Sequence, residues 1–377
     1  MRIDLKRRGL LAATAAAAAI LPSRGWSAGE DIVAGQIGPF TGMPAPDARE
    51  VNQGIRAAFA QINAGGGVNG RRLALFELDD GYKDEGFVRQ FAEAMKRRPV
   101  ALLSPVGTRS IQRMLDEKLL DAADTLVLNA IPGAESLRSP GHPKLFHIRA
   151  GDRQQVERII RHAVTLGMTQ MAVLVQDVPI GKSQLAAAVK AAESLNVKLT
   201  TFTVAANAAS LAEPAARAAA TPSHSALVLG SPKFGADAIV ALRKAGHAKS
   251  VYALSYVPPA MVMQAAEGAS RGVALAQVFP NPNGSKMALQ HRFQDAMKRA
   301  GVTGPYTVFH LEGYVNARVL AEGLRRTREA GAAGLARALR AMGDCDLGGY
   351  HVDFSRDNVG SSFVDIAVIN GAGRLVY

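Results

Sequence analysis

The spacing of hydrophobic residues changes repeatedly along the chain, which indicates strands and helices in alternation. The apolar run Ile32–Ile37 is short enough for a buried strand, and the glycine and proline content of residues 38–42 indicates a loop. Gly65–Gly67 end the helix that follows, and Leu73–Asp80 restarts a strand. That helix has one apolar face at three- and four-residue spacing, made by Val51, Ile55, Ala58, Phe59 and Ile62. The pattern therefore predicts one right-handed βαβ unit.

The same alternation continues through most of the chain. Stretches with helical spacing separate a series of predicted strands at Val100–Leu103, Leu126–Leu128, Phe146–Ile148, Met171–Val175, Leu199–Val204, Ala226–Leu229, Val251–Leu254 and Val273–Val278. A breaker cluster at Pro280–Gly284 ends this rhythm. Helical patterns follow through residues 291–342, and Tyr350–Phe354 and Phe363–Asn370 read as the last strands. The repeated order predicts an α/β fold with two parallel, helix-covered sheets.

The N-terminal residues have the pattern of an export signal. Lys6, Arg7 and Arg8 precede an apolar, alanine-rich run, and small residues follow at Ser27 and Ala28. We expect residues 1–28 to be a twin-arginine-like signal peptide that is cleaved near Ala28. The alternative is a signal anchor that stays attached, although the run is too short to span a bilayer comfortably.

Charge and cysteine content narrow the function classes. Of the formal net charge of +12, residues 1–28 carry +4 and the remainder +8. The basic runs of the body sit at predicted helix ends and turns, without interleaved aromatic residues, so nucleic acid is not an expected partner. Cys345 is the single cysteine and cannot form an internal disulfide, so we expect an exported chain that folds on its core alone.

Motifs for catalysis or cofactor binding are incomplete. Gly181-Lys182-Ser183 would end a phosphate loop, but the glycine needed five residues earlier is Gln176. No two histidines of the sequence are at helical metal spacing. We therefore expect no enzyme activity, no metal and no cofactor.

Binding is the remaining chemistry, and the fold class indicates where it occurs. Ligands of parallel α/β sheets sit outside the carboxyl ends of the strands. This rule selects the loops Phe40–Gly42, Gly107-Thr108, Ile131–Glu135, Asp177–Ile180, Ser231–Phe234 and Ser255–Val257, together with Gln277. Free N–H groups at the helix starts that follow would favour an anionic group such as a carboxylate.

Three stretches resemble one known family. INAGGGVNGRRLALFELDD, preceded by IGPFTG, resembles the first βαβ unit of periplasmic solute-binding proteins of the leucine/isoleucine/valine-binding family. GPYTVFHLEGYVNARVLAEGL and DLGGYHVDFS resemble its later part. The resemblance implies a two-lobed type I periplasmic binding protein fold, each lobe a mostly parallel sheet covered by helices. The implied hinge has three crossings, near Ala150, Pro280 and Leu347–Gly349. Lobe 1 would comprise residues 29–149 plus 280–346, and lobe 2 residues 150–279 plus 347–377.

The resemblance also implies roles for residues. Gly107-Thr108 and Pro132–Ala134 match the loops that hold the ligand carboxylate in amino-acid-binding relatives. Those relatives place an acid for the ammonium group where this chain has Tyr256. Asp177 or Glu135 could substitute for that acid, so the ligand is either a small carboxylate or carbonyl compound without an α-ammonium group, or a branched-chain amino acid. The expected ligand-binding residues are Phe40, Thr41, Gly107, Thr108, Pro132, Gly133, Ala134, Asp177, Ser231, Lys233, Tyr256 and Gln277.

The implied function is that of a monomeric periplasmic protein that feeds an ABC importer. Its ligand would be a small polar organic solute of the branched-chain amino acid, amide or aromatic acid class, and its partner a membrane permease. A ligand-sensing receptor module on the same fold is one alternative, and an enzyme on the same scaffold is the other.

Overall fold

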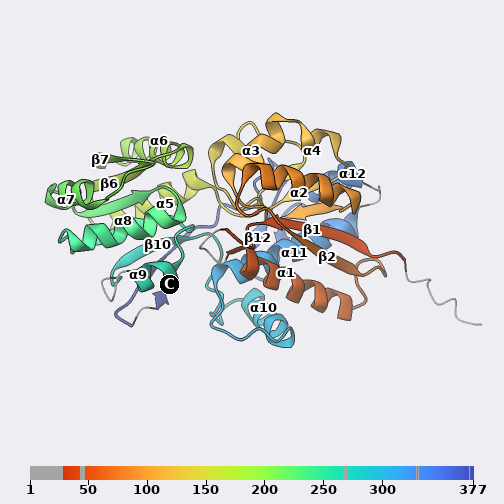
Figure 1. The fold of residues 1–377 in the computed structure, drawn as a ribbon. Helices are drawn as coiled ribbons and strands as arrows, with labels where there is room; N and C mark the ends of the chain where they lie inside the picture. Colours follow the sequence, from red (N-terminus) through yellow and green to blue (C-terminus); the bar gives the residue numbers. More distant parts are fainter. Residues whose placement is uncertain (1–28, 43–46, 266–269, 328, 330, 373) are drawn as a thin grey trace, which may run out of the picture.

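The computed structural model describes residues 29–42, 47–265, 270–327, 329, 331–372 and 374–377. The predicted signal peptide lies outside these residues. The described chain forms two lobes that lie side by side (Figure 1). Each lobe has its own sheet, and helices cover both faces of each sheet, so the predicted α/β fold with two mostly parallel sheets is confirmed. Within the described residues, no helix is long and apolar enough to cross a membrane.

Lobe 1 contains a five-stranded parallel sheet in the order β2-β1-β3-β4-β5. Its strands are β1 (Ile32–Gly38), β2 (Leu73–Asp79), β3 (Ala101–Leu103), β4 (Leu126–Leu128) and β5 (Leu145–Phe146). Its helices are α1 (Asp47–Ala64), α2 (Asp84–Lys96), α3 (Thr108–Asp116), α4 (Leu119–Ala122), α10 (Ala288–Arg299), α11 (Val308–Arg326) and α12 (Gly331–Arg340), with a 3-10 turn at Glu135–Leu137.

Lobe 2 contains a seven-stranded sheet in the order β14-β13-β10-β9-β8-β6-β7. Its strands are β6 (Gln170–Asp177), β7 (Lys198–Ala205), β8 (Ser225–Leu229), β9 (Ser250–Ala253), β10 (Val273–Gln277), β13 (Asp365–Ile369) and β14 (Leu375–Val376). β6 to β10 run parallel, whereas β13 is antiparallel to β10 and β14 to β13. Its helices are α5 (Asp152–Thr165), α6 (Pro179–Ser194), α7 (Ala212–Ala220), α8 (Pro232–Lys244) and α9 (Pro259–Ala265).

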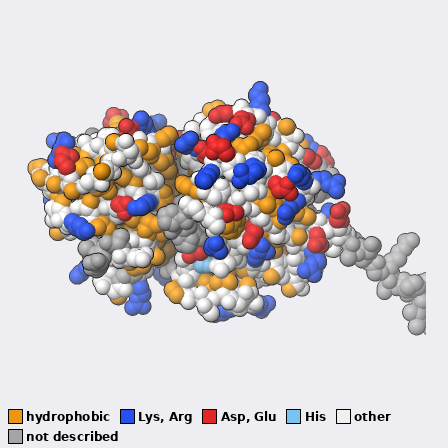
Figure 2. All heavy atoms as spheres, in the orientation of Figure 1, with side chains coloured by type: hydrophobic (Ala, Val, Ile, Leu, Met, Phe, Trp, Pro, Cys, Tyr) orange, Lys and Arg blue, Asp and Glu red, His pale blue; other side chains and the backbone are white. Residues whose placement is uncertain are grey.

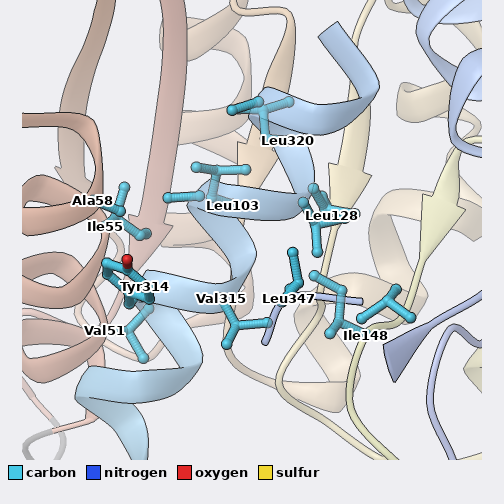
Figure 3. Close-up of a cluster of buried hydrophobic side chains, with 14 of the residues drawn as sticks. Val51, Ile55, Ala58, Leu103, Leu128, Ile148, Tyr314, Val315, Leu320 and Leu347 are labelled. Carbon is cyan, nitrogen blue, oxygen red and sulfur yellow. The ribbon is translucent and has the colours of Figure 1, made fainter. Parts of the chain in front are cut away.

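The core of lobe 1 follows the two-residue period of its strands. On β3, Leu103 points to the face covered by α1 and α11, while Leu102 points to the face covered by α2 and α3. Figure 3 shows the first of these faces, where Val51 and Ile55 of α1 lie beside Tyr314 of α11. Continuous apolar runs form these strands because both faces of the sheet are buried.

Helices α1 and α11 approach each other closely because glycines face the partner backbone. A Cβ on Gly54 would lie 2.0 Å from the carbonyl oxygen of His310, and one on Gly313 would lie 2.0 Å from that of Val51. Larger side chains at these positions would push the helices apart. The N-terminal and C-terminal thirds of the chain are thus packed into one lobe.

The chain crosses between the lobes three times. The first crossing follows β5 and ends at α5, and the second follows β10, whose next residues Val278 and Phe279 already pack in the lobe 1 core. The third crossing lies later than predicted, between Gly360 and β13, because Gly360 still donates its N–H to the His147 carbonyl of lobe 1 at 2.7 Å.

The predicted crossing at Leu347–Gly349 is therefore wrong. Gly348 and Gly349 have positive φ angles of 104° and 99° and form the turn between β11 (Cys345–Asp346) and β12 (His351–Val352). The apolar residues around this turn stay on lobe 1, where Tyr350 stacks on Phe279 and Phe354 packs edge-on against Phe146, each with ring centroids 5.2 Å apart.

Candidate functional site

The two lobes touch at loops that follow the carboxyl ends of β4 and β9. Gly133 comes from the β4 side and Tyr256 from the β9 side. The Tyr256 hydroxyl lies 2.1 Å from the point that a Cβ on Gly133 would occupy. Next to this contact, the N–H of Asp152 at the start of α5 donates to the Gly133 carbonyl at 2.9 Å. Two of the expected ligand residues, one from each lobe, are thus in direct contact, with Pro132 and Ala134 buried beside them.

Tyr256 is held by a buried carboxylate. Its hydroxyl donates to Asp152 Oδ1 at 2.5 Å, and both residues are buried. Burial raises the pKa of Tyr256 well above its ordinary value, and burial also raises the pKa of Asp152 despite the hydrogen bond from the tyrosine. Tyr256 is therefore a neutral hydrogen-bond donor at this contact.

A buried ion pair supports the contact from lobe 1. Nη1 of Arg149 lies 3.3 Å from both carboxylate oxygens of Glu312 on α11, and both side chains are fully buried. Burial alone would lower the pKa of Arg149, but the Glu312 carboxylate outweighs it together with smaller contributions from Tyr256, Asp152 and Tyr350, so that pKa is raised. Arg149 and Asp152 were not among the expected site residues. A charged pair directly after a buried strand, at a predicted crossing, was the available signal.

The other lobe 1 loops present backbone and hydroxyl groups. Gly107, with φ of 103°, precedes Thr108 at the start of α3, and no side chain caps this helix start. In the first loop the Thr41 N–H and hydroxyl donate to Asp79 at 3.1 and 2.5 Å. Burial would raise the pKa of Asp79, but hydrogen bonds from Thr41 and Gly81 lower it overall. Asp79 therefore fixes the conformation of the Phe40–Gly42 loop.

The remaining lobe 2 residues do not reach Tyr256 in this conformation. Asp177 is exposed and pairs with Lys182 at 2.8 Å, and Lys233 is exposed and pairs with Asp237 at 2.6 Å. Lys233 and Ser231 line a separate hollow of about 420 Å³ together with residues 204–206 and 208–211. That hollow lies at the carboxyl edge of the lobe 2 sheet, beside β6 and β7 rather than β9.

Two further candidate ligand residues, Gln277 and Glu135, already interact with other residues of the protein. Gln277 is buried, and its amide donates to the Ala276 carbonyl at 2.8 Å. Its oxygen lies 3.5 Å from the hydroxyl of the C-terminal Tyr377. Glu135 lies 3.6 Å from Arg153 of lobe 2, so this acid already has a basic partner across the junction. Among the described residues, no group of histidine, cysteine and acidic side chains is arranged to hold a metal ion.

Charged side chains of both signs are mixed on the face of the molecule that Figure 2 shows. On the face in Figure 2, Lys and Arg side chains are interspersed with Asp and Glu side chains on both lobes. Some exposed acidic and basic side chains form pairs at helical spacing, such as Arg161 with Glu157.

Comparisons with known proteins agree with this architecture. An extracellular ligand-binding receptor from Verminephrobacter eiseniae is 46% identical, with a TM-score of 0.87, over 92% of this chain and 100% of that chain. A substrate-binding periplasmic protein from Ralstonia solanacearum is 28% identical, with a TM-score of 0.82, over 92% of this chain and 99% of that chain.

A more distant structure shares the fold alone. An ABC transporter substrate-binding protein from Desulfitobacterium hafniense, in complex with leucine, is 20% identical with a TM-score of 0.76, over 92% of this chain and 99% of that chain. No curated protein sequence matches the chain. The sequence profile of the periplasmic binding proteins, however, matches residues 31–374. The chain therefore belongs to the periplasmic binding protein family, a class of non-enzymatic solute-binding proteins of ABC transporters.

Proposed function

We propose that the protein captures a small organic solute between its two lobes and presents it to the membrane permease of an ABC importer. The observation that carries this proposal is the contact of Gly133 with Tyr256, which joins a strand-end loop of each lobe at one point. A ligand that contacts both loops binds the closed arrangement more tightly than the open one, and so shifts the population towards the closed state.

The charges near this contact favour a ligand without an ammonium group. The acids Asp177 and Glu135 are each paired with a basic side chain. Asp152 is buried and already accepts a hydrogen bond from the Tyr256 hydroxyl, and burial raises its pKa although the nearby Arg138 acts in the opposite direction. A buried ammonium without a counter-charge costs several kcal/mol, which would remove most of a micromolar affinity.

A carboxylate, by contrast, has suitable donors on lobe 1. The start of α3 offers N–H groups without a side-chain cap, next to the half-buried Thr108 hydroxyl. We therefore propose a small carboxylate or carbonyl compound without an α-ammonium group, bound through Gly107, Thr108 and the Pro132–Ala134 loop.

Calorimetry with the mature protein tests the ligand class. We expect 4-methyl-2-oxopentanoate or 3-methyl-2-oxobutanoate to bind at micromolar concentration, and leucine and valine to bind at least tenfold more weakly. Thr108→Val should weaken binding of the oxo acid, whereas Thr221→Val, at the half-buried C-cap of α7, should not. Micromolar leucine binding that is lost in Asp177→Asn would overturn the proposal and place the ammonium group at Asp177.

We also propose that the protein acts in the periplasm after removal of residues 1–28. The family is periplasmic, and the N-terminal sequence has the charge and hydrophobicity pattern of a signal peptide. Intact-mass analysis of a periplasmic extract should find a chain that begins near Gly29. A full-length chain recovered only from the cytosol would contradict this localisation.

A further inference from the structure

Arg149 lies in the first crossing, and its side chain connects the two lobes directly. Nη1 is held by Glu312 of lobe 1, whereas Nη2 donates to Ser255 Oγ of lobe 2 at 2.6 Å. The guanidinium also lies over the ring of Tyr256, 5.0 Å from its centroid. One fully buried cation thus contacts both lobes next to the proposed binding site.

The lobe 1 end of this connection is rigidly defined. Asn129, at the end of β4, donates from its amide to Glu312 Oε1 at 2.9 Å. Its amide oxygen accepts the N–H groups of Ile148 and Arg149 at 3.1 Å each. Glu312 and the Arg149 backbone are therefore fixed to the same strand end, and the guanidinium has little freedom to follow lobe 2 if that lobe moves away.

The lobe 2 end belongs to the wall of the site. The Ser255 N–H donates to Gln155 Oε1 at 3.0 Å, which fixes the β9 loop to α5. Tyr256, the next residue, makes the contact with Gly133 described above. Ser255 and Tyr256 are neighbours on the same short loop. Any rotation that separates Tyr256 from Gly133 therefore also stretches the hydrogen bond between Arg149 and Ser255.

We propose that Arg149 is a positioning residue for ligand capture. Through Ser255 and Tyr256 it holds the lobe 2 wall against lobe 1, and so sets how often the lobes are closed before a ligand arrives. The inference rests on the proposed capture between lobes. The apparent ligand affinity is the intrinsic affinity multiplied by the fraction of molecules that is binding-competent, so this interlobe hydrogen bond also sets the affinity.

The test measures lobe separation without any ligand. Spin labels are placed on exposed positions of the two lobes, with Arg89→Cys on α2 and Lys190→Cys on α6, in a background where the buried Cys345 is replaced by alanine. Pulsed electron–electron double resonance then gives the distribution of distances between the two spin labels. Ser255→Ala removes the acceptor while it leaves the pair of Arg149 with Glu312 intact.

We expect Ser255→Ala to raise the ratio of open to closed molecules about tenfold, equal to about 1.4 kcal/mol. The matched control is Ser104→Ala, which removes a buried serine acceptor of Asn316 inside lobe 1. This control should lower the melting temperature and leave the distance distribution unchanged, as a purely structural hydroxyl would.

Two results separate the proposals. A distance distribution in Ser255→Ala equal to that of the parent protein would overturn the role of Arg149, whatever the ligand is. If Ser255→Ala opens the lobes but neither leucine nor 4-methyl-2-oxopentanoate shifts the distribution of the parent protein, the role of Arg149 stands and the proposed ligand class fails.

Discussion

Replacing Glu312 by glutamine should destabilise lobe 1 strongly. The carboxylate and the Arg149 guanidinium are both fully buried, and Glu312 also accepts a hydrogen bond from Asn129. Glutamine keeps the shape but removes the charge, and its amide group would face donors of Arg149 or Asn129. Removing one partner of a buried ion pair typically costs about 3–5 kcal/mol, because the other charge is left without compensation.

This cost is large enough to measure by thermal unfolding. For a unit of the size of one lobe, each kcal/mol lowers the melting temperature by about 2–4 °C, so the expected loss is about 6–20 °C. The matched control on the same helix is Glu322→Gln. Glu322 pairs with Arg325 and Arg326 at the surface, where such pairs contribute about 0–1 kcal/mol.

A double replacement separates charge from packing. Arg149→Met combined with Glu312→Leu removes both charges at similar volume, and should recover most of the stability that Glu312→Gln loses. If Glu312→Gln costs no more than Glu322→Gln, the buried pair is not what stabilises this end of β4, and the assignment of Arg149 as a fixed cation is wrong.

Two further perturbations test the loops of the site. Burial raises the pKa of Asp80 from 3.8 to about 6. The folded state therefore holds the proton more tightly than the unfolded state does, and this contribution to stability is complete below about pH 4. Up to about 3 kcal/mol of stability is lost as the pH rises through 6. Asp80→Asn should therefore raise the melting temperature at pH 8 and leave it unchanged at pH 4; an equal gain at both values would contradict the assignment. Gly133→Ala places a Cβ 2.1 Å from the Tyr256 hydroxyl, so it should weaken ligand binding at least tenfold in calorimetry, and Tyr256→Phe should restore part of the loss. Gly65→Ala has room for the added methyl group and should bind as the parent does.

Local patterns were sufficient to predict most of the fold. The strand Ile32–Ile37 and the helix through Val51 and Ile55 appear in the structure as β1 and α1, since their burial depends on spacing within a few residues. The pair Gly348-Gly349 was misinterpreted, because glycines permit a hinge and a hairpin turn equally well. Only the aromatic contacts of Tyr350 and Phe354 assign this segment to lobe 1.

The buried ion pair of the site could not be predicted from the sequence, for a different reason. Arg149 and its partner Glu312 are 163 positions apart, so no local pattern links them. The loops that contain Gly133 and Tyr256 were predicted from strand ends, but their mutual contact depends on how the lobes meet. The pairing of Asp177 with Lys182 likewise depends on a side-chain conformation that spacing leaves open.

The close packing of α1 against α11 has a consequence for how the chain folds. Gly54 and His310 meet across more than half of the sequence, and β13 must return to the edge of β10 after lobe 1 has taken up residues 278–360. Neither lobe can therefore complete its core during synthesis until almost the whole chain is available. Contacts of such long range slow folding. A fragment that ends at residue 360 would leave β10 as an unpaired edge, which favours association with other chains over the native sheet.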